Sequence, residues 1–270
     1  MRQSAIQAIE PKIGVPGPSF SLSRRQRLIS VPSLPIEAGL SVVVPIYNER
    51  ESLVSLVAQV TEAASSLGRD WELLLVDDGS DTATKARLGD LAGDQVRVLR
   101  LDRNRGQSVA LLAGFAASRY SVIATMDGDL QNDPRDFQRL LEALESADMV
   151  CGFRENRQDS HWRRWVSSQA NRIRNALTGD GVRDTGCSLK VMRREVLERV
   201  RFFQGAHRFM PALAQLEGFR VVEVPVSHRG RLHGETKYGN WQRLRATVPD
   251  LLGFLWMKSR YAEFLAEELR

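Results

Sequence analysis

Residues 122–133, VIATMDGDLQND, end an apolar run in a cluster of acids and amides. Asp127, Asp129 and Gln131 alternate, so they point to the same side for as long as the chain stays extended. Gly128 lets the backbone turn or a ligand approach closely. Carboxylate and amide oxygens suit Mg²⁺ or Mn²⁺ when the ion is shared with substrate phosphates. The stretch therefore predicts a divalent-metal site. The alternative is a capped loop with solvated acids, because a lone D-x-D pattern often occurs by chance.

The segment VVVPIYNERES places a second polar group after an apolar run. Pro45 ends ladder pairing and turns the chain outward, which leaves Tyr47 and Glu49 at the rim of a sheet. Asn48 followed three residues later by Glu51 resembles a capping signal. The alternative is an ordinary strand-to-helix turn.

Two further segments repeat this arrangement of polar residues after apolar ones. In LLLVDDGSDTAT, Asp77 and Asp78 could cap the following helix or accept hydrogen bonds from a base or from ribose hydroxyls. In DRNRGQSVALLAGF, Arg103 and Arg105 beside Gly106 at a helix start suit an anionic ligand. An acidic turn and two solvated arginines are the alternatives.

The elements that must position these residues alternate along the chain. Continuous Val/Ile/Leu strands alternating with helices indicate an α/β fold with a mostly parallel sheet covered on both faces. Ligands bind beyond the carboxyl ends of such strands, where all four polar segments fall. The expected strands are 40–47, 71–78, 96–102, 121–127 and 147–153, with another at 221–230, and the expected helices are 49 to about 67, 106–118, 134–146 and 162–177.

The two ends of the chain differ from this pattern. The beginning is dense in Pro, Ser and Arg and predicts a loosely ordered arm. Residues 241–270 read as mostly helical, with Pro249 forcing a break or a kink. The expected organisation is an arm at 1–38, a main domain at 39–230, and a loop with an amphipathic C-terminal helix at 231–270.

Composition limits the partners and the compartment. A net charge of +5 suggests an anionic partner, such as a nucleotide, a phospholipid surface or nucleic acid, against the alternative of a solvated basic surface. Cys151 and Cys187 lack metal-ligand spacing and are expected as buried thiols in a reducing compartment. No apolar run approaches the roughly 18–20 residues of a membrane span, and the N-terminus lacks the apolar core of a secretory signal. We therefore expect a cytoplasmic protein, soluble or peripherally associated with the inner face of the cell membrane.

The motifs VVVPIYNE, VDDGS, NRGQSVALLAGF, MDGDLQNDP, GFR and DTGCSLKVMRREVL together resemble the family-2 glycosyltransferases. That resemblance implies the GT-A fold, a Rossmann-like αβα sandwich that binds a nucleotide sugar. DLQNDP and GETKYG are similar to the dolichol-phosphate mannose synthase branch, whose members glycosylate polyprenyl phosphates. The resemblance spans about Leu40 to Gly239. This chain departs from many relatives, which continue into transmembrane helices, and from the common DADLQ motif, where it has Gly128.

The resemblance also implies roles for single residues. Nucleotide-sugar binding falls to Pro45, Tyr47, Glu49, Asp77, Asp78, Arg105, Gln107, Asp127 and Gly128, and metal binding to Asp127, Asp129 and Gln131. The lipid phosphate would meet Arg154, Arg163, Ser167 and Lys237, and the reaction itself would depend on Asp127, Asp129, Arg154 and Asp184.

The acceptor side has support from helical spacing as well. On the helix expected at 162–177, Arg163, Ser167, Asn171 and Arg174 share one stripe, which suits a phosphate head group beside apolar neighbours. The alternative is a surface helix packed on the sheet. The C-terminal helix, basic and aromatic, could lie in a membrane interface or close the core. The four histidines, His161, His207, His228 and His233, share no metal spacing and need no catalytic role.

The expected function is transfer of a hexose, mannose or glucose, from a GDP- or UDP-linked sugar to a polyprenyl phosphate, with inversion at the anomeric carbon. A phosphate acceptor is already anionic at neutral pH and needs no strong base. One rival uses a sugar hydroxyl as acceptor, with Asp184 as base. Another is a non-catalytic nucleic-acid-binding or regulatory module; the sequence has no recognition motif for it, so no nucleic-acid partner is expected.

Overall fold

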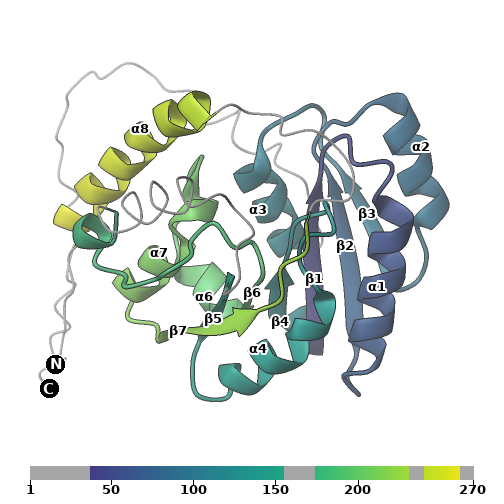
Figure 1. The fold of residues 1–270 in the computed structure, drawn as a ribbon, viewed down its shortest axis with the longest axis horizontal. Coiled ribbons are helices and arrows are strands. Elements are labelled where there is room, and N and C mark those ends of the chain that lie inside the picture. The colour runs from purple at the N-terminus through teal and green to yellow at the C-terminus, as the bar shows by residue number, and fades with distance from the viewer. Residues whose placement is uncertain (1–36, 155–173, 231–239, 262–270) are drawn as a thin grey trace, which may run out of the picture. The chain divides into compact units, whose positions relative to one another are not determined.

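The computed structural model describes residues 37–154, 174–230 and 240–261, which belong to one structural unit. Seven strands form a single sheet in the order β3-β2-β1-β4-β6-β5-β7 (Figure 1). Strand β6 runs antiparallel to β4 and β5, and the other neighbouring strands pair in parallel. The expected mostly parallel sheet is therefore confirmed. The strands are β1 (Glu37–Ile46), β2 (Trp71–Asp77), β3 (Val96–Arg100), β4 (Tyr120–Thr125), β5 (Met149–Arg154), β6 (Lys190–Arg193) and β7 (Val221–Val226).

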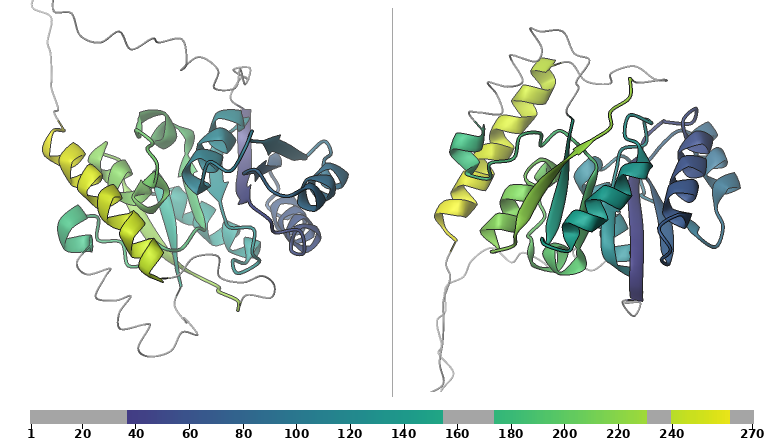
Figure 2. Two further views of the ribbon diagram at one scale, coloured as in Figure 1. Left: turned by 90° about the horizontal axis from the view of Figure 1, so that it is seen from above. Right: turned by 60° about the horizontal axis from the view of Figure 1, so that its bottom comes forward.

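Helices cover both faces of the sheet, as Figure 2 shows from two further directions. On one face, Leu56 of α1 and Phe137 of α4 join Val42 of β1 in the main hydrophobic core. On the other face α3 packs directly on β1 and β2, because Gly114 brings its backbone against Val43. The helices are α1 (Leu53–Ser65), α2 (Thr82–Leu91), α3 (Gln107–Ala117), α4 (Phe137–Leu144), α6 (Arg194–Arg199), α7 (Met210–Leu216) and α8 (Asn240–Ser259), with 3₁₀ turns η2 (Pro134–Asp136) and η3 (Ala206–Arg208).

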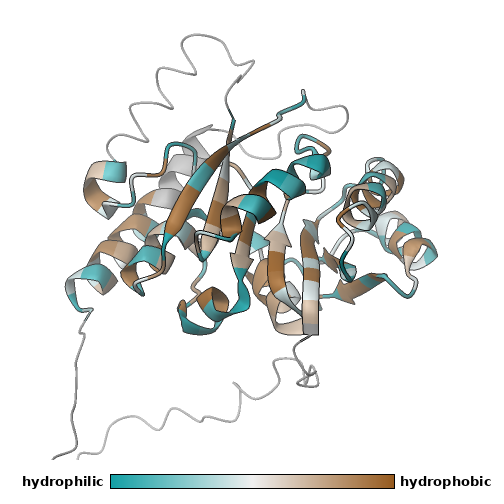
Figure 3. Ribbon diagram, turned by 90° about the horizontal axis from the view of Figure 1, so that it is seen from below, coloured by the Kyte–Doolittle hydropathy of each residue, from teal (hydrophilic) through white to brown (hydrophobic). Residues whose placement is uncertain are grey.

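Continuous burial along the central strands shows that both faces of this sheet are covered. All seven residues of β2 are buried, whereas the edge strand β3 is partly exposed along its length. Figure 3 shows mainly hydrophobic residues along the central strands and hydrophilic residues on the outer turns of the helices. The two cysteines are buried and free, as expected, and burial raises the pKa of Cys151 to about 12.

Three details of the expected elements are wrong. The first helix begins at Leu53 rather than at Glu49, because Asn48 adopts a left-handed φ of 55° and bonds to another loop instead of capping. Strand β6 was not anticipated, since it has only four residues. Of the break or kink expected at Pro249, the break is wrong, because helix α8 runs through this residue as one element.

Part of the sequence-based expectation lies outside the described residues. The ranges 1–36, 155–173, 231–239 and 262–270 include most of the expected arm, much of the helix expected at 162–177, and the predicted acceptor residues Arg163, Ser167 and Lys237. Of that expected helix, residues 174–177 are described; they are helical, and the helix continues to residue 178.

Candidate active site at the carboxyl edge of the sheet

Hydrogen bonds tie together the loops that follow β1, β2 and β4. The backbone N–H of Asn48 donates to Ser80 Oγ at 3.0 Å, and Asn48 Oδ1 accepts from the N–H of Asp81 at 2.8 Å. On the other side, the buried Ser52 hydroxyl donates to the carbonyl of Gly128 at 2.7 Å. Because parallel strands end at the same edge, three of the four polar segments meet here, as the sequence predicts.

The loop after β3 is joined to this group by Asp78. Its carboxylate accepts from the backbone N–H groups of Arg105 at 2.6 Å and Gly106 at 2.9 Å, at the start of α3. Burial raises the pKa of Asp78, and these two hydrogen bonds act against that shift. Gly79 has a φ of +74°, and a Cβ there would overlap the backbone of Arg103, so the two loops touch at this glycine.

Asp77 has a structural use at the same turn. Its side chain is fully buried, with Oδ1 accepting from the N–H of Ser80 at 2.8 Å and Oδ2 accepting from Arg100 Nε at 3.2 Å. The idea that the adjacent acids cap the next helix is wrong, because Asp81 caps α2 through Thr84 N–H at 2.7 Å. The expectation that Pro45 ends ladder pairing is wrong, because β1 pairs with β2 through Pro45 as far as Ile46. Tyr47 and Glu49 lie partly buried just beyond it.

The acidic segment forms a turn rather than an extended strand. Strand β4 ends at Thr125, and the chain turns at once, with Leu130 at a φ of 62°. The argument that alternation alone aligns the acids is therefore wrong, although the two acids do lie close together. Burial first, and then the charge of Asp129, raise the pKa of Asp127. Gln107 Nε2 donates to Asp127 Oδ1 at 2.9 Å, which places a second predicted donor-site residue beside the turn.

A divalent cation fits the chemistry of this turn. Asp127 and Asp129 present carboxylates whose mutual repulsion a cation would relieve, and Asp129 Oδ1 also accepts from the N–H of Gln131 at 3.2 Å. Among the described residues no group of three or more His, Cys, Asp or Glu side chains is arranged to hold a metal. Mg²⁺ commonly uses one or two carboxylates and completes its coordination with substrate phosphates and water, so two acids suffice.

Strand β6 and the residues just before it contact the acidic turn. The N–H of Asp127 donates to Ser188 Oγ at 3.1 Å, and the Ser188 hydroxyl donates to Asn132 Oδ1 at 2.8 Å. Lys190, on β6 and 4% exposed, donates to the carbonyl of Cys187. Its positive charge acts against the rise in the pKa of Asp127. Sequence analysis missed Lys190; the signal was a lone cation inside the apolar stretch SLKVM.

Arg154 and Asp184 form a bidentate ion pair at the end of β5. Arg154 Nε and Nη2 donate to the two carboxylate oxygens at 2.7 and 2.9 Å, and the Arg154 N–H lies 3.3 Å from Oδ2. The side chains are 16% and 9% exposed. Asp184 is therefore placed to orient Arg154, whereas the hydroxyl-acceptor alternative needs it as a base. The charge of Arg154 also reaches Asp127, so the pair lies beside the acidic turn.

His207 is a second residue that sequence analysis missed. It lies in η3, and its Nδ1 is 2.7 Å from Ser108 Oγ at the start of α3. Burial, together with the charges of Arg208 and Lys190, lowers its pKa to about 3. The contact between η3 and α3 sets the position of this histidine, and spacing along the sequence does not reveal that contact.

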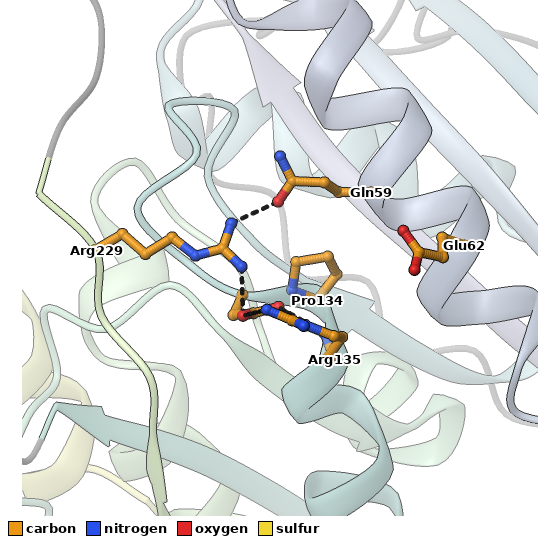
Figure 4. A pocket seen from close by; sticks show the side chains of 6 residues that line it. Gln59, Glu62, Pro134, Arg135 and Arg229 are labelled. Carbon is orange, nitrogen blue, oxygen red and sulfur yellow. Dashed lines mark hydrogen bonds and ion pairs between the residues drawn. The ribbon is translucent and has the colours of Figure 1, made fainter.

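A hollow of about 230 Å³ lies beside the acidic turn, between α1 and η2 (Figure 4). Arg229 crosses it, donating to Gln59 Oε1 at 2.6 Å and to the carboxylate of Asp133, which Arg135 also binds. Burial opposes ionisation of Asp133, but the two guanidinium groups outweigh it and lower its pKa to about 2. The N–H of Arg229 also donates to the carbonyl of Gln131 at 2.9 Å. The segment after β7 is thus fastened to the acidic turn.

The chain matches one protein-family model and is similar in sequence to known proteins. A family model described as Glycosyl transferase family 2 matches residues 41–201. The chain is 40% identical over 236 residues to a dodecaprenyl-phosphate galacturonate synthase of Rhizobium johnstonii, covering 83% of this chain and 70% of that protein. It is 39% identical over 217 residues to an undecaprenyl-phosphate 4-deoxy-4-formamido-L-arabinose transferase of an Enterobacter species, covering 79% and 66%.

A similar arrangement of elements occurs in solved structures of distant sequence. Glucosyl-3-phosphoglycerate synthase from Mycobacterium tuberculosis, in complex with Mn²⁺, UDP and phosphoglyceric acid, superposes with a TM-score of 0.63 at 18% identity, covering 84% of this chain and 80% of that chain. The same enzyme with Mg²⁺ and UDP also gives a TM-score of 0.63, at 19% identity.

Proposed function

This chain belongs to glycosyl transferase family 2 and has the GT-A fold, and from that premise we propose that it transfers a sugar from a nucleotide diphosphate donor to a polyprenyl phosphate. The names of two relatives, a dodecaprenyl-phosphate galacturonate synthase and an undecaprenyl-phosphate aminosugar transferase, support this acceptor class. The observation that carries the proposal is the bidentate pair between Arg154 and Asp184 beside the acidic turn.

The ion pair argues for a phosphate acceptor rather than a hydroxyl acceptor. A sugar hydroxyl needs a base to remove its proton, and Asp184 was the candidate. Taking up a proton would cost Asp184 its ion pair and leave the charge of Arg154 partly buried without its counterion. A lipid phosphate is already anionic and needs only orientation and neutralisation, which an arginine held in a fixed direction can supply.

The reaction would be a direct displacement. An oxygen of the lipid phosphate forms the new bond to the anomeric carbon as the bond from that carbon to the donor diphosphate breaks, so the configuration inverts. The electron pair leaves with the diphosphate, and no proton has to move. Catalysis then depends on alignment of the two substrates and on stabilising charge on the leaving group.

Asp127 and Asp129, with Gln131, would hold the metal ion in this scheme. When bound, a divalent cation supplies charge neutralisation for the departing diphosphate. Gln107 keeps Asp127 oriented through its 2.9 Å hydrogen bond, and Ser188, just before β6, accepts from the backbone N–H of Asp127. The Mn²⁺ and Mg²⁺ present with UDP in the M. tuberculosis enzyme support a divalent ion here.

The donor nucleotide would lie over the loops after β1, β2 and β3. Pro45, Tyr47 and Glu49 would line one side, and Asp77 and Asp78 the base and ribose side. Arg105 would face the donor as well, although in the free protein its guanidinium pairs with Asp102 at 2.6 Å. Both acids already hold loop backbone, so we assign them mainly to shaping the pocket. UDP in the structural neighbours supports a uridine donor over a guanosine donor.

The sugar is the finer part of the proposal. Mannose or glucose follows from the resemblance to dolichol-phosphate mannose synthases, whereas the two relatives are named for galacturonate and for 4-deoxy-4-formamido-L-arabinose. We therefore propose a UDP-linked pyranose and include all four sugars in the test. Arg163, Ser167 and Lys237 stay proposed contacts of the lipid phosphate.

A lipid acceptor requires the site to reach a membrane surface. No helix among the described residues is long and apolar enough to span a bilayer. Helix α8, however, exposes Val248, Leu252 and Trp256 at a spacing of four residues, with Lys258 and Arg260 close by. An exposed apolar stripe next to cations suits the interface of an anionic membrane, and we propose that α8 lies on it.

A calorimetric binding screen tests the donor side. UDP- and GDP-linked mannose, glucose, galacturonate and 4-formamido-arabinose are titrated with and without Mn²⁺. We expect one UDP-sugar to bind at least roughly 10-fold more tightly with Mn²⁺, and Asp129→Asn to abolish that gain. Asp133→Asn, which alters an acid bound to arginines in the same turn, should retain it. If every nucleotide sugar that binds tightly does so with the same affinity with and without Mn²⁺, the metal site is contradicted.

A further inference from the structure

His207 has a hydrogen-bonding arrangement that the proposed function does not yet use. Ser108 Oγ lies 2.7 Å from His207 Nδ1, and it accepts from the backbone N–H of Gly205 at 3.1 Å and of His207 at 3.4 Å. Ser108 itself is 3% exposed, so water competes little for these bonds.

The position of the ring proton follows from this arrangement. A serine hydroxyl has a single hydrogen and two acceptor lone pairs. Since two N–H groups point at Ser108 Oγ, its own hydrogen is left for His207 Nδ1. Nδ1 is therefore an acceptor, and the neutral imidazole carries its proton on Nε2. Burial, Arg208 and Lys190 lower the pKa of His207 to about 3, so the ring is neutral at physiological pH.

The Nε2–H group is available to a ligand. Within the described part of the chain no residue hydrogen-bonds Nε2, and Nε2 is not one of the buried polar atoms that lack a partner. The residue as a whole is partly exposed. In the free protein water can satisfy this N–H group, and a ligand oxygen can take the place of that water.

The surroundings indicate what that ligand is. Ser108 follows Gln107, which donates to Asp127 of the acidic turn, so η3 lies beside the proposed site. Lys190 and Arg208 place positive charge near His207, although Arg208 also pairs with Asp250 at 3.2 Å. Such an environment attracts anionic oxygen, and a neutral donor can orient it without adding further charge.

We propose that His207 contacts the substrates directly, its Nε2–H donating to a phosphoryl oxygen. This inference rests on the proposed function for the class of ligand. The oxygen could belong to the donor diphosphate or to the lipid phosphate, and the two sources share the same chemistry. His207 would thereby be a substrate-positioning residue rather than a base, since its free nitrogen already carries a proton.

Nitrogen-15 NMR of the imidazole tests the tautomer and the contact. The side-chain signals of His207, identified by their loss in His207→Gln, should show a protonated Nε2 and an unprotonated Nδ1. We expect the Nε2 signal to shift when UDP with Mg²⁺, or a short polyprenyl phosphate, is added. The ligand that causes the shift identifies the source of the oxygen. A proton on Nδ1, or an unmoved Nε2 signal while calorimetry shows both ligands bound, would overturn the inference.

Two variants give an independent kinetic readout. The amide N–H of His207→Gln can approach the position of Nε2, whereas His207→Asn keeps a polar group near Nδ1 but falls short of the ligand. We expect kcat/KM to fall at least roughly 10-fold in the Asn variant and to be largely rescued in the Gln variant. Equal losses in two folded variants would reduce His207 to a structural role.

Failure of the proposed function would be distinguishable. A ligand-dependent shift without sugar transfer contradicts the function and leaves the His207 contact standing. Binding of both ligands without a shift overturns the contact alone, and binding of neither ligand overturns both.

Discussion

The acids of residues 127–133 differ in what neutralises them, and that difference indicates their roles. Asp133 is bound by Arg135 and Arg229, which lower its pKa to about 2, so its charge is already balanced within the protein. Asp127 has an amide and a hydroxyl as hydrogen-bonding neighbours, and burial raises its pKa. A cation therefore gains more from Asp127 than from Asp133, although both acids lie in one short segment.

Asp184→Asn separates a base from a positioning residue. If Asp184 orients Arg154, the variant should raise the KM for polyprenyl phosphate by roughly 10-fold and leave the shape of the pH–rate profile unchanged. Steady-state kinetics between pH 5 and 9 provide the measurement. Loss of the chemical step as large as in Asp129→Ala, with disappearance of the acidic limb from the profile, would favour the hydroxyl acceptor.

At the scale of elements, the site is built by contacts between loops rather than by any one strand. The loop after β2 holds the loop after β3 through Asp78, and the loop after β1 holds the acidic turn through Ser52. The ion pair between Arg229 and Asp133 then joins the segment after β7 to that turn. A substitution that moves one loop should therefore also change the positions of the loops that it contacts.

Gly79→Ala should show the close approach of two loops. Gly79 has a φ of +74° and faces the backbone of Arg103, whereas Gly68 has a φ of +64° and open space around it. Both alanine variants incur backbone strain, but only Gly79→Ala adds a clash with main chain. We expect Gly79→Ala to lower the free energy of unfolding by about 1–3 kcal/mol more than Gly68→Ala, measured by urea denaturation. Equal losses would show that the loops can separate freely.

Arg229→Gln should change the acid stability of the fold. The folded pKa of Asp133, about 2, lies below the ordinary value of 3.8, so its contribution to stability is present above pH 4 and is lost as the pH falls toward 2. Removing one of its two guanidinium partners moves the folded pKa up toward the ordinary value. The loss of stability on acidification should therefore be smaller and should be complete at a higher pH. Urea midpoints measured from pH 2 to 7 provide the test.

Arg139→Gln is the matched control, because Arg139 donates to the carbonyl of Pro225 and holds no acid. Its acid limb should coincide with that of the unaltered protein. If the stability of Arg229→Gln at low pH also coincides with that of the unaltered protein, the ion pair between Arg229 and Asp133 does not stabilise the fold.

These elements show how far sequence reasoning reaches. Apolar periodicity predicts the parallel strands and the position of the acidic turn, because both depend on local pattern. The start of α1 is wrong because Asn48 bonds to the N–H of Asp81, a contact more than thirty residues away in the chain. Lys190 and His207 are missed for the same reason: each is placed by packing against an element that no local spacing reveals.

At the scale of the whole molecule, α8 connects the site to the proposed membrane surface. Arg208, next to His207, pairs with Asp250 of α8 at 3.2 Å, and Phe209 stacks on Phe254 with ring centroids 5.5 Å apart. One face of α8 is thus fixed to the elements around the site, while Leu252 and Trp256, 62% and 67% exposed, are directed away from it. A membrane that bound this outer face would keep the site at a fixed distance from the membrane surface.

Flotation with vesicles that contain anionic lipid tests this arrangement. The double variant Leu252→Ser/Trp256→Ser should lower the bound fraction by roughly 10-fold, because it removes the apolar contact and keeps the charge. Val54→Ser/Leu112→Ser, which alters apolar residues 44% and 46% exposed on α1 and α3, is the matched control. If both double variants float like the unaltered protein, α8 does not mediate binding.

The most direct test of the account is a transfer assay that offers two acceptors of equal chain length, a polyprenyl phosphate and the corresponding polyprenol. Each is incubated with the UDP-sugar that binds most tightly and with Mn²⁺, and the products are identified by mass spectrometry. We predict a sugar-phosphate-polyprenyl product and free UDP with the phosphate acceptor alone. Transfer to the polyprenol at a comparable rate, or release of UDP without any glycosylated lipid, would contradict the central claim.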